Sequence, residues 1–399
     1  MTATDSAPGT QPWSVAPVID WLLHRGRHLT DPEALLTAIC NRVRDAGMPL
    51  DRANVFISTL HPQYFGFALA WEDGASQTYF GSHEDRESDT VMLSPMAPIV
   101  EGERVIRRRL QQADCPFDFP ILYELKEQGF TDYVIAELVF STGARNGVSL
   151  ATRTDGGFTD HDVEEIEQIL HLFAILMESH TNRGVAANLM DTYLGSISGA
   201  RVLDGQIKRG DGDHIDAVIW FSDLRQSTPL AEQLGQDEFL ALLNDYFEAT
   251  AGPVLAHGGE VLRFIGDASL AVFPLGEDAL PSEVCERAMA AAKEVRERAQ
   301  VTNAARRSRG ATPFEYGVGL HRGQVLYGNI GTPERLEFSV VGAAANESAR
   351  IEALTKDVGT DIVLSETVAR HIDPRELRSL GKQQLRGVAR EIEVYALAT

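Results

Sequence analysis

The sequence predicts an α+β protein of two domains, and three observations support this prediction. The chain has 399 residues, which is more than one ordinary hydrophobic core organises. Its second half shows apolar runs and helical patterns in the order β-α-β-β-α-β, whereas its first half reads as helices, strands and a helix. A hydrophobic content of 44% fits a globular protein.

Charge and cysteine content limit the function classes and the compartment. The net charge of −22 argues against a nucleic-acid partner, because a phosphate backbone requires clustered lysine and arginine. No apolar run reaches the roughly 20 residues that span a membrane. The polar stretch 1–16 lacks a signal-peptide pattern and predicts a disordered tail. The three cysteines have no metal-ligand spacing, so they predict reduced thiols in a cytoplasmic protein.

Residues 17–180 form the predicted first domain. Its apolar patterns predict helices in 17–48, a strand at 53–59, a second strand between two turns in 61–74, a helix and a strand in 119–140, a strand at 144–153 and a long helix in 156–179. The Asn146-Gly147 pair predicts a turn. The Gly- and Asp-rich stretch 181–213 predicts a linker, partly helical at its start.

The order of these elements and the GGFTDHDVEEIEQI pattern at 156–169 resemble a GAF-type domain. The resemblance implies a central antiparallel sheet flanked by helices, which either binds an unknown small ligand or serves dimerisation. His61, His83 and Trp71 are candidate ligand contacts, or else residues of turns and core. The sequence does not name the ligand.

The long helix carries apolar residues spaced 3, 4, 3 and 4, namely Val163, Ile166, Leu170, Phe173 and Met177. This spacing is typical of a coiled-coil seam, but it covers only about two heptads. Two interpretations stay open: one face packed on the domain's own sheet, or a parallel dimer helix that couples the two halves.

The second domain is predicted over residues 214–399. Its elements are a strand at 217–222, a helix over 228–250, strands at 260–265 and 269–273, a helix over 281–300, two strands across 314–330, a strand at 336–342, a helix over 344–355 and terminal strands. A β-α-β-β-α-β run builds an antiparallel sheet with helices on one side, the ferredoxin-like arrangement.

Two aspartates stand at element ends in this domain. Asp223 follows a buried strand, and Asp267 lies in a tight turn after Gly266. The strands 217–222 and 260–265 are expected to be neighbours, which brings the two carboxylates together. A carboxylate pair of this kind can hold two divalent ions that activate an attacking oxygen and stabilise a leaving one.

A third feature is the helix that contains Asn346 and Arg350. These residues are four apart and therefore share one helical face. An amide and a guanidinium on one face suit the ribose and phosphate of a nucleotide.

Together these features resemble the catalytic domain of class III nucleotide cyclases, over about 214–398. The family pattern F-x-D-[IL]-R-G-F-T corresponds to FSDLRQST at 221–228, and K-F-x-G-D corresponds to RFIGD at 263–267. The glycine-rich G-I-H-x-G stretch corresponds to GLHRG at 319–323, and V-N-x-A-A-R corresponds to ANESAR at 345–350. Gln226, Ser227 and Ala343 depart from the family pattern.

The resemblance implies an enzyme that converts ATP to 3′,5′-cyclic AMP and pyrophosphate under control of the N-terminal domain. Asp223, Asp267 and the Leu224 carbonyl would hold two Mg²⁺ or Mn²⁺ ions. Asn346 would orient the ribose, and Arg350 would stabilise charge on the α-phosphate. Thr228 and Arg386 would be further substrate-binding residues.

The family's sites lie between two subunits, and this chain carries both sets of residues, so the resemblance implies a homodimer. Arg263 and Ser339 stand at the base-reading positions. Arg263 is a donor only, which fits the acceptor N1 of adenine better than the N1–H of guanine. The alternatives are a guanylate cyclase and a degenerate domain that only binds nucleotide or dimerises.

Overall fold

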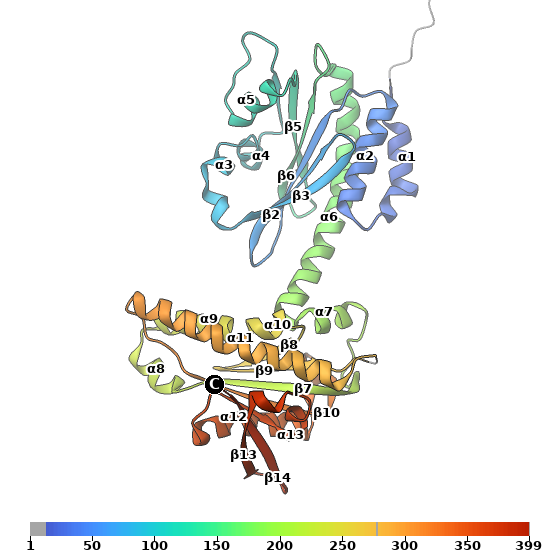
Figure 1. The fold of residues 1–399 in the computed structure, drawn as a ribbon. Coiled ribbons are helices and arrows are strands. Elements are labelled where there is room, and N and C mark those ends of the chain that lie inside the picture. The colour runs from blue at the N-terminus through green and yellow to red at the C-terminus, as the bar shows by residue number, and fades with distance from the viewer. Residues whose placement is uncertain (1–12, 277, 399) are drawn as a thin grey trace, which may run out of the picture. The chain divides into compact units, whose positions relative to one another are not determined.

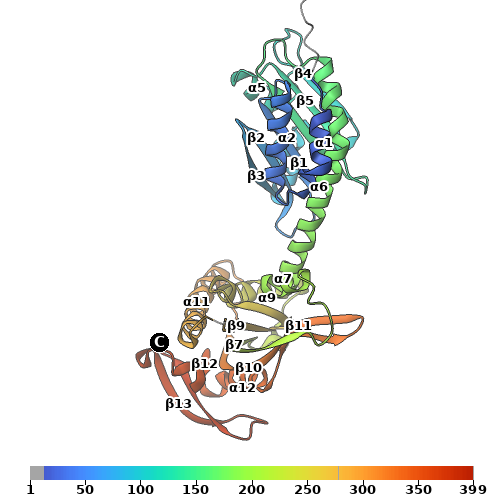
Figure 2. The ribbon, with the colours of Figure 1, turned by 90° about the vertical axis from the view of Figure 1, so that its right-hand side faces the viewer.

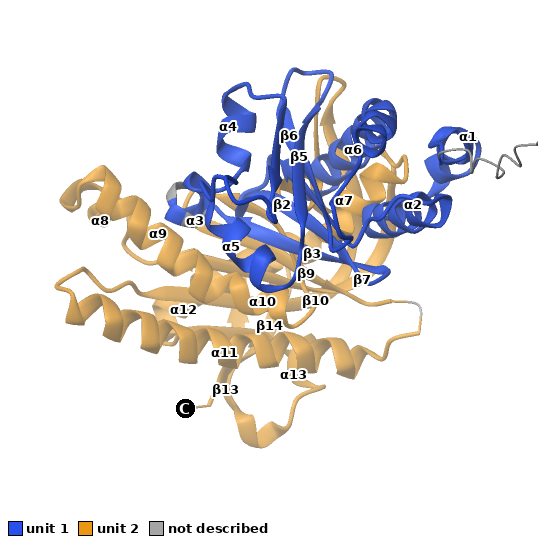
Figure 3. Cartoon of the chain, turned by 90° about the horizontal axis from the view of Figure 1, so that it is seen from above, with its two compact units in different colours: residues 1–189 blue, residues 190–399 orange. Residues whose placement is uncertain are grey.

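The computed structural model describes residues 13–276 and 278–398. The chain divides into two compact units, residues 1–189 and 190–399, which Figure 3 distinguishes by colour. Each unit has its own sheet and its own core, so the predicted α+β class is confirmed.

The N-terminal unit is built on a six-stranded antiparallel sheet of order β3-β2-β1-β6-β5-β4. Its strands are β1 (Arg52–Ser58), β2 (Tyr64–Glu72), β3 (Ala75–Ser82), β4 (Val105–Arg109), β5 (Asp132–Val139) and β6 (Arg145–Thr152). One face packs on α1 (Ala16–His24), α2 (Pro32–Ala46) and α6 (Asp160–Leu194), and the other is covered by α3 (Asp89–Met92), α4 (Met96–Glu101) and α5 (Pro120–Glu127), as Figure 1 shows. Two short 3₁₀ helices, η1 (Gly26–His28) and η2 (Glu84–Glu87), complete the unit.

A flanked antiparallel sheet is the architecture that the sequence predicts here, and the GAF-type resemblance itself stays a prediction. The predicted turn at Asn146-Gly147 is wrong, because both residues lie within β6. The Asn146 side chain accepts a hydrogen bond from the Ser58 amide at 2.9 Å, and a β-carbon on Gly147 would collide with Met96. The asparagine therefore joins two strands, and the glycine makes room for α4.

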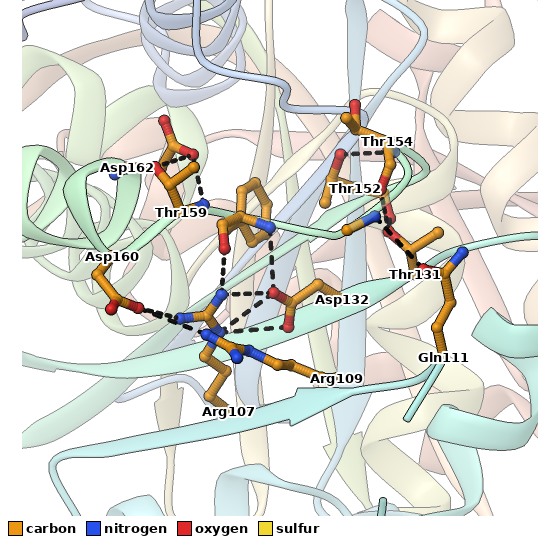
Figure 4. Close-up of polar contacts among 12 residues, drawn as sticks. Arg107, Arg109, Gln111, Thr131, Asp132, Thr152, Thr154, Thr159, Asp160 and Asp162 are labelled. Carbon is orange, nitrogen blue, oxygen red and sulfur yellow. Dashed lines mark hydrogen bonds and ion pairs between the residues drawn. The ribbon is translucent and has the colours of Figure 1, made fainter. Parts of the chain in front are cut away.

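A buried ionic cluster fixes the start of α6 (Figure 4). The fully buried Asp132 of β5 pairs with Arg107 of β4 at 2.7 Å and accepts the Phe158 amide at 3.1 Å. Arg107 also reaches Asp160, the first residue of α6, at 3.1 Å. These contacts join β4, β5 and the loop before α6 through charge-assisted hydrogen bonds.

The coiled-coil spacing of α6 serves the domain's own core. Val163 packs against this core, and Ile166, Leu170, Phe173 and Met177 are buried within it. The first of the two interpretations therefore holds for these residues. Residues 1–12 of the predicted disordered tail lie outside the described residues, but Trp13 of that tail donates to Asp162 of α6 at 2.6 Å.

The C-terminal unit contains an eight-stranded sheet of order β13-β14-β12-β10-β7-β9-β8, with β11 paired to β10. The strands are β7 (Gly212–Leu224), β8 (Glu260–Ile265), β9 (Ala268–Pro274), β10 (Tyr316–Thr332), β11 (Arg335–Val341), β12 (Ile362–Ser365), β13 (Leu377–Gln384) and β14 (Glu391–Leu397). The antiparallel set β8-β9-β7-β10 confirms the predicted ferredoxin-like core.

The helices of this unit differ from the prediction in number and in side. They are α7 (Ser196–Leu203), α8 (Ser227–Gln233), α9 (Gln236–Thr250), α10 (Gly252–Ala256), α11 (Pro281–Ser308), α12 (Ala343–Val358), α13 (Glu366–Ala369) and η3 (Pro374–Glu376). The predicted helix 228–250 is broken at Leu234–Gly235, and the two strands predicted across 314–330 are one strand, β10.

Helices lie on both faces of this sheet, so the predicted one-sided arrangement is wrong. Val218 and Trp220 of β7 point into the core that α9 and α11 cover, whereas α12 packs on the other face (Figures 1 and 2). A β-carbon on Gly319 of β10 would collide with the backbone of Glu352 in α12. The glycine therefore allows helix backbone to lie directly on the strand.

The predicted linker 181–213 is largely helical. It contains the last part of α6 and α7, which is attached to the sheet of the C-terminal unit. The buried carboxylate of Glu260 in β8 accepts the Ser198 amide of α7 at 2.7 Å and the hydroxyl of Tyr327 in β10. A carboxylate at a helix start satisfies free amide groups and the helix dipole.

Candidate active site

Two carboxylates meet where β7 ends. Asp223 pairs in register with Ala268, the first residue of β9, and Asp267 directly precedes Ala268 in the turn from β8. The Leu224 amide donates to the Asp267 carbonyl at 3.2 Å. Gly266 has φ +64, the left-handed conformation that this tight turn needs.

The predicted reason for the proximity of Asp223 and Asp267 is wrong in one respect. The strands 217–222 and 260–265 are not direct neighbours, because β9 lies between β7 and β8. Asp267 reaches Asp223 nevertheless, since it stands in the turn that leads into β9.

Asp223 lies in an environment that penalises its negative charge. Burial raises the pKa of Asp223, a hydrogen bond from Lys356 opposes this shift, and the charge of Asp267 raises the pKa further. The Lys356 ammonium of α12 stands 3.2 Å from the Asp223 carboxylate. Repulsion between the two aspartates makes this position favourable for cations.

Sequence reasoning missed Lys356 and a second group beside it, Glu352. Burial and the charge of Asp223 raise the pKa of Glu352 to about 7. Arg225 contributes positive charge nearby, and its guanidinium donates to the carbonyls of Tyr316 at 2.9 Å and Thr360 at 2.7 Å. No sequence signal marks these residues, because their approach depends on which face of the sheet α12 covers.

The residues at this position fit a divalent metal ion bound together with a substrate. Among the described residues no group of three or more His, Cys, Asp or Glu side chains is placed to hold a metal ion alone. Mg²⁺ in nucleotide enzymes is commonly held by one or two carboxylates together with substrate phosphates. Asp223 and Asp267 supply such a pair, and their mutual repulsion favours a cation between them.

The segment after Asp223 contains a strained residue. Gln226 has φ +56, a left-handed conformation that non-glycine residues seldom adopt, at the position where the cyclase pattern has glycine. Thr228 is exposed in the first turn of α8. The chain therefore forms a left-handed turn here without glycine, the residue that adopts this conformation most readily.

Asn346 and Arg350 are both exposed on α12, away from its buried residues Ser348 and Thr355. Asn346 lies ten residues before Lys356, which is about 15 Å along a helix axis. Because Lys356 contacts Asp223, Asn346 stands at the opposite end of α12 from the aspartate pair of its own chain. The chain alone does not bring the two halves of the predicted site together.

The two candidate base-reading residues lie on β8 and β11, which are not paired with each other in the sheet. Arg263 of β8 forms an ion pair with Glu337 of β11 at 2.6 Å, and both side chains are about half exposed. Ser339 is buried, two residues beyond Glu337, and alternate strand residues share a face. Glu337 is thus a third polar group at this position, which sequence reasoning missed.

Arg386 lies in the connection between β13 and β14, and it is exposed. The structure thus brings together Asp223, Leu224 and Asp267 at one place, and at another it joins Arg263 to Glu337 on the strand that carries Ser339. It leaves the role of Arg386 a prediction.

Residues 212–399 match the family model of the adenylate and guanylate cyclase catalytic domain. Adenylate cyclase 1 of Rhizobium meliloti (strain 1021) is 30% identical over 183 residues, which are 45% of this chain and 27% of that protein. The adenylate cyclase of Anabaena cylindrica is 32% identical over 184 residues, which are 45% of this chain and 36% of that protein. The chain therefore spans well under half the length of these two relatives.

A solved structure, that of the guanylyl cyclase Cya2, is 31% identical to this chain. The superposition covers 47% of this chain and 93% of that one, with a TM-score of 0.41. Within the described residues, no helix combines the length and the apolar character that crossing a bilayer requires.

Proposed function

Because residues 212–399 belong to the adenylate and guanylate cyclase catalytic domain family, we propose that this protein is an adenylate cyclase. It converts ATP to 3′,5′-cyclic AMP and pyrophosphate. The observation that carries the proposal is the pair Asp223 and Asp267, held side by side at the end of β7 within the family segment.

In the proposed reaction the ribose 3′-oxygen forms a bond with the α-phosphorus. The bond from that phosphorus to the bridging oxygen of the β-phosphate breaks, and the 3′-hydroxyl proton passes to water or to a substrate phosphate. Asp223, Asp267 and the Leu224 carbonyl would hold two Mg²⁺ or Mn²⁺ ions, which supply charge stabilisation and lower the pKa of the 3′-hydroxyl.

The remaining roles belong to side chains. Asn346 orients the ribose, and Arg350 offsets the charge that develops on the α-phosphate. Thr228 and Arg386 contact the phosphates. Arg263 and Ser339 contact the adenine base, with Arg263 donating to N1.

We propose a homodimer, in which each site takes its aspartates from one subunit and Asn346 and Arg350 from the other. The placement of Asn346 and Lys356 at opposite ends of α12 supports this arrangement, because the chain's own aspartates lie at the Lys356 end. The N-terminal unit would regulate the dimer. The unpaired cysteines Cys40, Cys115 and Cys285 support a cytoplasmic location.

One observation favours a second candidate, a guanylate cyclase. The Glu337 carboxylate beside Arg263 is an acceptor, and it could receive hydrogen bonds from N1–H and the amino group of guanine. Replacing this acceptor separates the two candidates. We expect Glu337→Gln to leave the ATP rate within about twofold, whereas a guanylate cyclase would lose its GTP rate by about tenfold or more.

The first experiment incubates the full chain with ATP or GTP and Mn²⁺ and measures both cyclic nucleotides. We expect cyclic AMP from ATP at a higher rate than cyclic GMP from GTP. Intact dimers that form neither product would contradict the enzyme and support the degenerate domain.

The second experiment tests the shared site. Asp223→Ala and Arg350→Ala should each lower the rate by about 10²- to 10³-fold, because each removes a group needed in the transition state. Mixing the two variants should restore up to about a quarter of the wild-type rate, since half of the random dimers then carry one intact site. Exposed Arg370→Ala is the control, and failure of the mixture to recover any activity would contradict the shared site.

A further inference from the structure

The N-terminal unit contains a cavity of about 1490 Å³ that none of the catalytic residues lines. Its lining residues come from the strands and from the segments that include α3, α4 and α5. Figure 1 shows these helices on the face of the sheet opposite α2 and α6. Ligand pockets usually measure about 300–1,000 Å³, so a medium-sized organic molecule fits.

The cavity results from side-chain size that alternates along the strands. In β2 the large residues Leu69 and Trp71 belong to the core on the helix-packed face, whereas the small residues Gly66, Ala68 and Ala70 line the cavity. In β6 the same pattern recurs, since Val148 and Leu150 enter that core, and the residues between and beside them are Gly147, Ser149 and Ala151. On the cavity floor, which is this side of the sheet, β2 and β6 thus carry small residues, whereas Phe56 of β1 and Tyr133 of β5 are larger residues of the lining.

Arg52 supplies positive charge on this floor. It pairs in register with Glu72 on one side and Ala151 on the other, and Ala151 pairs with Tyr133. The Glu72 carboxylate is engaged by Arg153 at 2.7 Å. Among the described residues Arg52 has no ion-pair partner of its own. Arg86 and the carboxylates Asp89, Glu101 and Glu124 also line the cavity, but all four side chains are exposed, whereas Arg52 is partly buried.

The cavity mouth carries large apolar side chains that are exposed. Each of them is more than half exposed, and they are Leu60, Tyr79, Phe80, Met92, Leu93 and Val100. Exposed apolar side chains that gather at one opening mark a binding site. All three sequence candidates, His61, His83 and Trp71, line the cavity, and Trp71 also belongs to the buried core of the helix-packed face.

We propose that this cavity binds an organic anion with an extended apolar body. The body lies over the small residues of β2 and β6 and is enclosed by the apolar mouth, and the anionic group pairs with Arg52. In a chain of net charge −22, an anion requires such a local cation, and a neutral apolar molecule would make no use of it.

The test compares two fluorescent probes that share the same rings. The probe 1-anilinonaphthalene-8-sulfonate carries an anionic group, and N-phenyl-1-naphthylamine lacks it. Each is titrated into the full chain, its Arg52→Met variant and the control Arg27→Met, which replaces an exposed arginine outside the cavity. We expect Arg52→Met to raise the Kd of the sulfonate probe about tenfold and to change that of the neutral probe less than twofold.

A second variant locates the binding. Ala68→Phe fills the floor and should abolish saturable binding of both probes, with Ala70→Leu as a milder substitute if Ala68→Phe fails to fold. Equal affinity for the sulfonate probe in wild type and Arg52→Met would overturn the anion assignment. Unchanged binding of both probes in a folded floor-filled variant would overturn the cavity, and would leave the apolar mouth as a surface for a protein partner.

Discussion

At the residue scale, the groups around Asp223 affect how strongly the candidate site binds a metal ion. The carboxylate is partly buried, repelled by Asp267 and paired with Lys356 at 3.2 Å. A lysine in this position competes with an incoming cation for the same oxygen atoms. The Lys356 side chain is half exposed, so its competition with a metal ion for the Asp223 carboxylate is modest.

We expect Lys356→Met to tighten Mn²⁺ binding about two- to fivefold at pH 8, because it removes both the competing contact and a repulsive charge. The measurement follows free Mn²⁺ by electron paramagnetic resonance without nucleotide. Lys382→Met replaces an exposed lysine of β13 and should change nothing. Weaker Mn²⁺ binding in Lys356→Met would show that the lysine supports the site.

Glu352 gives the C-terminal unit a pH dependence of known sign. Its pKa is raised from 4.5 to about 7 by burial and by Asp223, so the folded state holds a proton that the unfolded state has lost. Ionisation of Glu352 in the folded state therefore lowers the free energy of unfolding. This loss is absent below pH 4.5, grows as pH rises, and is complete above pH 7.

We expect Glu352→Gln to remove this loss in the free energy of unfolding. The gain in free energy of unfolding over wild type should grow from near zero at pH 4.5 to about 3 kcal/mol above pH 7. Denaturant unfolding in the presence of a chelator measures it, and exposed Glu391→Gln is the control. A difference that is the same at every pH would contradict the raised pKa.

The aspartate pair was predictable from the sequence because both signals are local, a strand end and a glycine turn. Lys356, Glu352 and Glu337 were not, because each meets its partner only through packing between elements distant in the chain. Gln226 was visible as a departure from the cyclase pattern, but only the backbone shows that it keeps the left-handed conformation.

At the element scale, the sequence predicted the order of strands and helices well. It predicted less well where each element begins and ends and which face of the sheet each helix covers. Short stretches rich in apolar residues identified β1, β2 and β7, and a helical pattern identified α12. The side that α12 covers depends on glycines in β10, which in the sequence read only as a glycine-rich motif.

These glycines provide a test of the α12 packing. A β-carbon at Gly319 would stand 2.6 Å from the Ser348 carbonyl, so Gly319→Ala must push α12 from the strand. We expect a loss of about 1–3 kcal/mol in the free energy of unfolding of the C-terminal unit, measured in denaturant. Gly235→Ala is the matched control, since its β-carbon meets nothing within 4 Å and its φ is −63. Equal stability of the two variants would contradict the close packing.

The cluster at the start of α6 makes a second element-scale prediction. Asp132→Ala leaves Arg107 without its buried partner, and we expect a loss of about 3 kcal/mol in the N-terminal unit. Asp118→Ala removes a more exposed partner of Arg108 and should cost less than about 1 kcal/mol. Thermal unfolding followed by circular dichroism compares them. Similar losses of stability in both variants would show that burial adds nothing to the contribution of the Asp132–Arg107 ion pair.

At the scale of the whole molecule, each of the two units is expected to carry one function, catalysis in the C-terminal unit and ligand binding in the N-terminal unit. The sequence predicted this division from length and from the change of pattern. It placed the junction in a linker that is partly helical at its start, because glycine and aspartate in 181–213 favour loops. The helix α7 forms there because its start is stabilised by Glu260, which lies 62 residues further along the chain.

The contact between Glu260 and α7 determines where the catalytic unit can be separated from whatever precedes it. A chain that begins at residue 212, where the family match begins, would lose Ser198 and leave the buried carboxylate of Glu260 without that amide. We expect residues 190–399 to melt at higher temperature than residues 212–399, by several degrees for a loss of about 1–3 kcal/mol. Equal melting temperatures would contradict this. A different input domain would therefore be joined before Gly195, so that α7 stays with the C-terminal unit whose buried Glu260 it satisfies.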